Sequence, residues 1–205
     1  DYEKIGIWQN TEEDLAEMAK FNANGSNFKP GAIRLWDNGD YKINSDDRRI
    51  LGQARPKIVA SIINNFTYKD FDLSFFFLGN FGGMIKNNIE YLNQTHRNSN
   101  VKVNYWTPSN PTNDFPRPIE GVDFLDYYTT LQYEKSDFIR LRNVTLGYTL
   151  PKDLGKKVDI SRCRIYVQAQ NPWIWTSYKG VDPEGAAGIT RPSASSWIIG
   201  LNLNF

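Results

Sequence analysis

Five stretches of the chain alternate apolar and polar residues with a period of two, the spacing that places successive side chains on opposite faces of a β-strand. The last stretch is the clearest, since every second residue from 197 to 205 is apolar: Trp197, Ile199, Leu201, Leu203 and Phe205. The other four stretches span residues 57–68, 71–79, 137–150 and 162–175. The pattern predicts an all-β protein with about five antiparallel strands.

The stretch at 137–150 changes its apolar parity near Asn143. Ile139 and Leu141 lie on one parity, and three later residues lie on the other: Val144, Leu146 and Tyr148. One extra residue in a strand exchanges its two faces. A β-bulge near Asn143 is therefore predicted.

Residues 1–56 show no such alternation and are predicted to be a loop region outside the strands, which occupy 57–205. A short helix is expected from Thr11 to Ala19, because Thr11 is a good N-cap and acidic residues follow it in the first turn. The segment 22–31 is rich in Asn, Gly and Pro and indicates turns.

The connectors between the predicted strands alternate in length. Lys69-Asp70 and 151–161 are short, whereas 83–135 and 176–195 are long. Outer-membrane β-barrels combine short periplasmic turns with long extracellular loops, and carry aromatic girdles at both interfaces. Aromatic residues lie at both ends of the strands: Trp173, Trp175, Tyr178 and Trp197 at one, and Tyr68, Phe71 and Tyr148 at the other. A soluble β-sandwich or jelly roll explains the alternation equally well but not the unequal loops.

Composition narrows the function classes. A formal net charge of +1 gives no electrostatic reason to bind nucleic acid. The single cysteine, Cys163, excludes an internal disulfide and a zinc site built on cysteine pairs. No apolar run approaches the roughly 20 residues of a membrane-spanning helix. An aromatic content of 14% favours β structure.

No arrangement of side chains indicates catalysis, so the chain is predicted not to be an enzyme and to need no cofactor. The single histidine, His96, lies in an Asn-rich loop without a nearby cysteine or a serine in a recognisable motif. The carboxylate neighbours Glu12-Glu13 and Asp46-Asp47 are interpreted as solvated loop charges rather than an acid/base pair.

Several segments, in the same order, resemble the C-terminal part of the SusC/RagA family of TonB-dependent outer-membrane transporters of Bacteroidetes. They are PGAIRLWDNGDYKINSDDRRILGQARPKI (30–58), FTYKDFDLSFFFLGNFGG (66–83), FIRLRNVTLGYTLP (138–151), RIYVQAQNPWIWTSYKGVDPE (164–184) and the final strand. Leu51 departs from the family pattern, which usually has Ile directly before Gly.

The resemblance implies the C-terminal strands of a 22-stranded transmembrane barrel in the bacterial outer membrane. Residues 1–56 are then expected to be an extracellular loop region of that barrel. About five strands cannot close a barrel, so the other strands, the N-terminal plug and the TonB-contacting region would come from residues outside this chain. The implied partners are lipid, TonB and a SusD-like surface lipoprotein, and the implied cargo is a glycan or oligopeptide. The alternative function is a soluble β-domain that binds glycans through its loops.

The loop 36–47 also resembles an EF-hand-like loop of the family. Calcium needs oxygen ligands at set positions, and counting from Trp36 gives Asn38, Asp40, Asn44 and Asp47. Trp36 cannot ligate, so an Asx-rich turn held by its own hydrogen bonds is favoured and no metal site is predicted. Loop aromatics such as Trp106, Tyr127 and Tyr128 could stack on sugars, but packing within the loops is favoured, and the substrate-binding residues are unknown.

Overall fold

The structure, a computed structural model, describes residues 1–87, 102–122, 125–151, 160–184 and 193–205. The chain divides into two compact units. Unit 1 is built mainly from Asp1–Gln53 and Lys86–Glu134, and unit 2 from Ala54–Ile85, Lys135–Ala186 and Thr190–Phe205. No helix among the described residues is long and apolar enough to cross a membrane.

The elements follow in chain order. They are β1 (Lys4–Ile7), α1 (Glu12–Ala23), β2 (Ile33–Leu35), the 3-10 turn η1 (Ser45–Asp47), β3 (Ile58–Tyr68), β4 (Phe71–Phe81), β5 (Met84–Lys86), the 3-10 turn η2 (Tyr128–Leu131), β6 (Tyr133–Lys135), β7 (Phe138–Thr149), β8 (Arg162–Thr176) and β9 (Ser196–Asn204).

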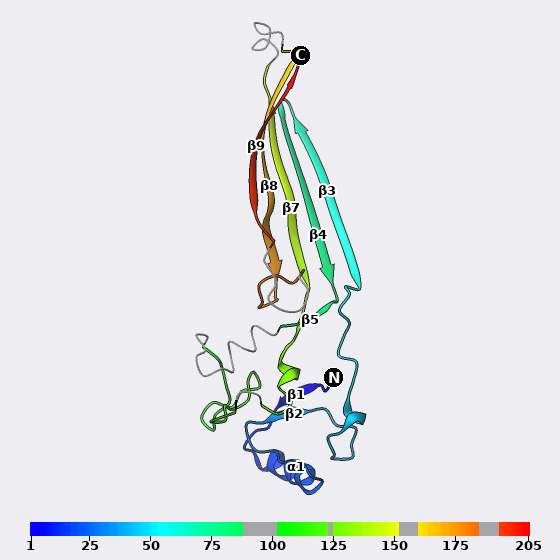
Figure 1. Cartoon of the computed structure of the whole chain (residues 1–205), viewed down its shortest axis with the longest axis vertical. Helices are drawn as coiled ribbons and strands as arrows, with labels where there is room; N and C mark the ends of the chain where they lie inside the picture. The colour runs from blue at the N-terminus through cyan, green and yellow to red at the C-terminus, as the bar shows by residue number, and fades with distance from the viewer. Residues whose placement is uncertain (88–101, 123–124, 152–159, 185–192) are drawn as a thin grey trace. The chain divides into compact units, whose positions relative to one another are not determined.

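Unit 2 is a five-stranded antiparallel sheet in the order β3-β4-β7-β8-β9 (Figure 1). The five predicted strands are confirmed, each within two residues of its predicted ends. The hairpin between β3 and β4 closes at Lys69, whose φ of 54° lies in the left-handed region. Residues 152–159, in the predicted short connector after β7, lie outside the described part of the chain.

The predicted β-bulge is also confirmed. The register of β7 shifts between Leu141 and Asn143 against both of its neighbours, which leaves Arg142 without a paired partner in the ladder. On β8 the same shift falls at Asn171, whose φ is 46°. The bulge keeps Ile139 and Leu141 on the same face as Val144 and Leu146.

Unit 1 contains more regular structure than its sequence predicts. The helix α1 begins after Thr11, whose hydroxyl accepts a hydrogen bond from the Asp14 backbone, as expected, but it continues to Ala23. Strands β1 and β2 pair with each other and were not predicted. Strands of three or four residues are too short for a periodic pattern to stand out.

Two apolar clusters form the core of unit 1. The helix contributes Met18 and Phe21 to a cluster with Trp8 and Phe28. The short sheet contributes Ile7, Ile33 and Leu35 to a second cluster, which is completed by Trp106. The buried Trp106 indole donates a hydrogen bond to Gln9 over 2.7 Å. These contacts join the start of the chain to a segment about a hundred residues later.

Candidate functional site

One face of the unit 2 sheet is almost continuously apolar. Residues that are directly paired in an antiparallel sheet share a face. The register therefore assigns the members of this apolar face: Ile58, Ala60, Ile62, Phe66, Tyr68, Phe71, Leu73, Phe75, Phe77, Phe81, Ile139, Leu141, Val144, Leu146, Tyr148, Ile165, Val167, Ala169, Trp173, Trp175, Trp197, Ile199, Leu201 and Leu203. Asn64 is its main polar interruption.

Much of the apolar face is exposed, and an exposed apolar surface of this extent marks a site of contact with a membrane or with other protein. Trp197 is 73% and Ile199 79% exposed. Aromatic side chains gather at both of its ends. At the turn end the rings of Phe71 and Tyr148 lie 4.7 Å apart, and at the other end Trp173 stacks on Trp175 at 6.0 Å. The sequence predicted both groups.

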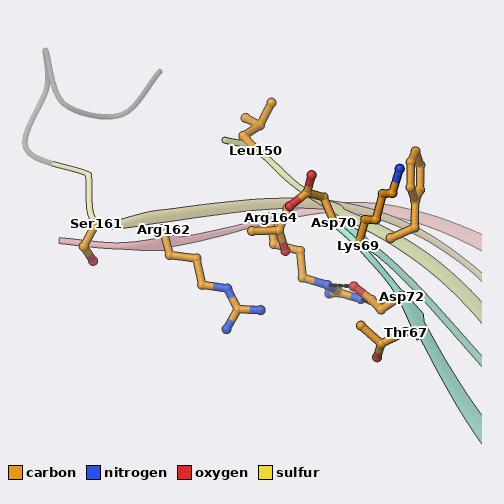
Figure 2. Close-up of a pocket in the computed structure, with 10 residues that line it drawn as sticks. Thr67, Lys69, Asp70, Asp72, Leu150, Ser161, Arg162 and Arg164 are labelled. Carbon is orange, nitrogen blue, oxygen red and sulfur yellow. Dashed lines mark hydrogen bonds and ion pairs between the residues drawn. The ribbon is translucent and has the colours of Figure 1, made fainter. Parts of the chain in front are cut away.

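The opposite, polar face carries an ion pair that spans three strands. Arg164 on β8 donates two hydrogen bonds to the carboxylate of Asp72 on β4, of 2.7 and 2.5 Å. Gly147 on the intervening strand β7 leaves the space, because a Cβ there would overlap both side chains. The pair lines a pocket of about 620 Å³ at the turn end of the sheet, where Figure 2 shows it together with Arg162.

An aromatic ring extends this row across the polar face. Tyr166 pairs with Gly200 on β9, and its ring occupies the space above that glycine. The guanidinium of Arg164 lies 5.0 Å from the centre of the same ring. The row of Asp72, Arg164 and Tyr166 therefore crosses the polar face near its turn end. Its side chains fill the space that Gly147 and Gly200 leave open.

A second charged group lies near the opposite end of the polar face. Arg140, whose side chain is 4% exposed, pairs with Asp182 at 2.7 Å and with Glu184 at 3.2 Å. Burial raises the pKa of the Asp182 carboxyl, but hydrogen bonds from the Glu184 backbone and from the backbone and hydroxyl of Ser193, together with the charge on Arg140, hold it below its ordinary value. Neither charged group could be predicted from the sequence, because the partners in each group are far apart in the chain.

The acidic loop of unit 1 is held by hydrogen bonds from its own backbone. Asp37 accepts from Gly39 and Tyr41, and Asp40 accepts from Lys42. The fully buried Asp47 accepts from Asn38 at 3.0 Å and from Asn44 at 2.8 Å. The Asx-rich turn expected from the sequence is confirmed.

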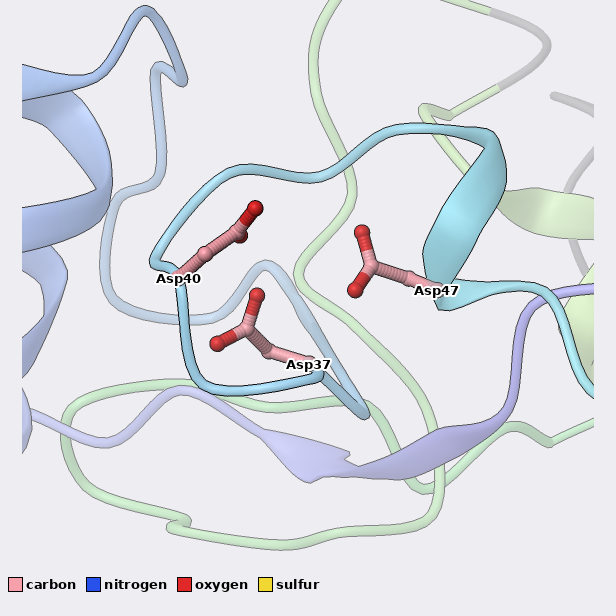
Figure 3. A group of neighbouring side chains, drawn as sticks. All are labelled: Asp37, Asp40 and Asp47. Carbon is pink, nitrogen blue, oxygen red and sulfur yellow. The ribbon is translucent and has the colours of Figure 1, made fainter.

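The same loop brings three carboxylates together, as Figure 3 shows. Asp37, Asp40 and Asp47 each place an oxygen within 4.8 Å of the others, and Oδ1 of Asp37 is buried without a hydrogen-bond partner. Hard divalent cations such as Ca²⁺ prefer this all-oxygen chemistry. The side-chain oxygens of Asn38 and Asn44 instead accept from the backbone of Asp40 and Asp46. The set that could hold a cation thus contains Asp37, which the count from Trp36 had left out.

The loop aromatics pack against other parts of unit 1. Trp106 is buried in the core. Tyr127 lies against Tyr2, with ring centres 5.3 Å apart, and against Phe28. Burial raises the pKa of the Tyr127 hydroxyl, and Tyr2 adds to the effect. The expectation that Trp106 and Tyr127 pack within the loops is therefore confirmed. His96 lies outside the described residues.

Comparison with known proteins gives consistent relatives. No family model matches the chain. TonB-dependent receptor P3 of Formosa agariphila is 31% identical over 206 residues, which cover 98% of this chain and 20% of that receptor. TonB-dependent receptor SusC of Bacteroides thetaiotaomicron is 28% identical over 176 residues, covering 82% and 17%. The chain thus spans about a fifth of the length of these relatives.

Solved structures give the same fold. The RagAB peptide transporter matches with a TM-score of 0.75 and 24% identity, over 100% of this chain and 22% of that one. The RagAB peptide importer in the open-open state matches with a TM-score of 0.74. The five strands are therefore part of a larger antiparallel barrel, as predicted. The relatives are receptors and a transporter, which confirms the expectation that the chain is not an enzyme.

Proposed function

We infer that this chain is part of a SusC/RagA-type TonB-dependent receptor, and we propose that it forms one wall of an outer-membrane importer. No bond of the cargo is made or broken in such a protein. The chain's contribution is a segment of barrel that separates lipid on one side from a polar interior on the other.

The observation that carries the proposal is the contrast between the two faces of the sheet. The apolar face exposes large side chains such as Ile199 and Trp197. In a bilayer these side chains contact lipid tails, and the aromatic residues at both ends of the strands lie at the two interfaces. The polar face, with Asp72 and Arg164, then lines the lumen. In barrels of this kind the interior is polar.

The sidedness follows from the connectors. The turn at Lys69-Asp70 joins β3 to β4 directly, whereas 51 residues separate the end of β4 at Phe81 from the start of β6 at Tyr133. Short turns are periplasmic and long loops extracellular in outer-membrane barrels. Unit 1 and the loop after β8 therefore belong to the cell exterior. There they would meet a SusD-like lipoprotein and the cargo.

The cargo class is a glycan or an oligopeptide. The similarity to SusC and to the RagAB transporter supports this cargo class. The RagAB protein is described as a peptide transporter. Energy would come from TonB through an N-terminal region outside this chain.

Uptake by cells tests the proposal. Cells with and without the full-length receptor are given two fluorescein-labelled probes, maltoheptaose and a tryptic digest of casein. We expect receptor-dependent uptake of one probe, abolished when TonB is deleted. Uptake of neither probe above the level of receptor-deleted cells, or uptake that persists without TonB, would overturn the proposal.

Membrane partition tests the alternative of a soluble glycan-binding domain. The full-length receptor should sediment with outer membranes and be released only by detergent. A protein that remains in the aqueous fraction and binds maltoheptaose would favour the alternative instead.

A further inference from the structure

The bulge in β7 places two arginines next to the loop that follows β8. Arg140 precedes the bulge, on the polar face, and is paired in register with Leu78 and Ile174. Arg142 lies at the bulge itself, outside the ladder. Its guanidinium donates to the side-chain oxygen of Asn171, at the matching irregularity in β8, over 3.2 Å. Arg142 therefore projects from the strand at the bulge itself, two residues after Arg140, which lies in the regular ladder.

Two carboxylates of the loop after β8 form ion pairs with these arginines. Asp182 pairs with Arg140, and the contact is almost fully removed from water, with side chains 4% and 5% exposed. Glu184 pairs with both Arg140 and Arg142. Two positive and two negative charges thus form one closed group, in which every cation has a carboxylate partner.

The same group fastens the loop at a second point. Ser193 donates two hydrogen bonds to Asp182, from its backbone and its hydroxyl, each 2.9 Å long. Two residues later, the hydroxyl of Ser195 donates to the carbonyl oxygen of Asn171 over 2.7 Å. The loop is therefore held both at 182–184 and at 193–195, on the same part of the sheet.

We propose that Arg140 and Arg142 are positioning residues of the importer, which dock the described residues 182–184 and 193–195 of the loop after β8 onto the polar face and so build the lumen wall that the cargo meets. The statement rests on the proposed function, since it takes the polar face as the lumen.

The free-energy balance of buried ion pairs indicates that this group fixes the position of the loop rather than adding much to the stability of the fold. Burying ion pairs removes charges from water, and the attraction between them often only offsets that cost. A buried charge that loses its partner is strongly unfavourable. The group therefore strongly prefers the single loop position in which all four charges are paired. The group itself carries no net charge when both carboxyl groups are ionised.

Spin labelling of the loop tests the docking directly. Val181 is 51% exposed and next to Asp182, so a nitroxide on Val181→Cys, in the full-length receptor with its native cysteines replaced by alanine, reports the motion of the loop. We expect a slow, ordered spectrum in the parent receptor. Asp182→Asn and Glu184→Gln should each at least double its mobile fraction, while heat-modifiable migration shows that the barrel still assembles.

Glu184→Gln guards against failure to fold, because the Glu184 side chain is 27% exposed and its loss leaves Asp182 paired. Asp72→Asn is the matched control. It breaks a carboxylate–guanidinium pair on the same face but near the turn end, so the label at Val181 should keep its ordered spectrum. An ordered label in both loop variants would overturn the docking role.

Uptake of the transported probe then separates this inference from the proposed function. If docking shapes the cargo path, Glu184→Gln should raise the KM for uptake about tenfold, which corresponds to roughly 1.4 kcal/mol, with the amount of receptor in the membrane unchanged. A mobile loop with an unchanged KM would overturn the inference and leave the importer intact. Absence of uptake in the parent receptor would instead contradict the proposed function, while the spin-label result would still test docking.

Discussion

Arg164 on β8 reaches over Gly147 on β7 to pair with Asp72 on β4, so that one ion pair ties together three strands of the sheet. The two residues are 92 positions apart in the chain. A side chain at the central position would block the pair, so the glycine is as much a part of it as the charges are.

Gly147→Ala should therefore weaken the assembled barrel, because the new Cβ forces the guanidinium of Arg164 away from Asp72. Hydrogen bonds to charged groups contribute about 1.5–3 kcal/mol, and we expect a loss of that order. Urea unfolding of the full-length receptor in lipid vesicles measures it. Ser74→Ala, on the same face of β4, is the control, and equal stability of the two variants would contradict the prediction.

Leu201→Arg should disfavour insertion, since Leu201 belongs to the apolar face and is 55% exposed. An arginine facing lipid near the bilayer midplane costs about 2–4 kcal/mol. The control is Gln168→Arg, which places the same charge on the polar face. Folding yield and unfolding free energy in vesicles compare the two. A smaller loss for Leu201→Arg than for Gln168→Arg would reverse the assignment of the faces.

Trypsin added to intact cells should reveal the sidedness. Lys69, Lys102 and Lys179 are all exposed, so access from outside, rather than burial, decides which is cut. Cleavage after Lys102 and Lys179, in the long loops, should precede cleavage after Lys69 in the short turn. Mass spectrometry of the fragments gives the order, and early cleavage at Lys69 would invert the proposed topology.

Acid should release the loop after β8. The pKa of Asp182 is lowered in the folded protein, so its contribution to stability is present above the ordinary aspartate pKa of about 3.9 and is lost as the pH falls through the lower, folded value. The spin label at Val181 should remain ordered at pH 5 and become mobile only below about pH 4. Asp182→Asn should abolish this change, with the label mobile at every pH.

Calcium should stabilise the loop that contains Asp37, Asp40 and Asp47. At about 1 mM Ca²⁺, a site with a Kd of about 0.1 mM gains about 1.4 kcal/mol. Terbium emission sensitised by the neighbouring Trp36 reports binding to the full-length receptor, and calcium should compete with it. Asp40→Asn should weaken binding. If emission does not respond to calcium, the Asx turns alone hold the loop.

The strands of unit 2 could be predicted from the sequence because alternation along a strand is a local property. From Trp197 to Leu203 an apolar residue recurs at every second position, so the pattern can be recognised within the single strand. The change of parity at Asn143 even located the bulge. The unequal connectors and the aromatic ends then favoured a membrane barrel over a soluble sheet.

The contacts that hold these elements in place were decided by the tertiary structure. Asp72 and Arg164 meet only because the register of three strands aligns them, and Arg140 meets Asp182 only because the loop folds back onto β7. Trp106 completes a core begun by Ile7, a hundred residues earlier. Such pairs leave no periodic pattern in the chain. The sequence determines which face each residue takes, while which residues meet across strands and loops depends on the packing of the whole sheet.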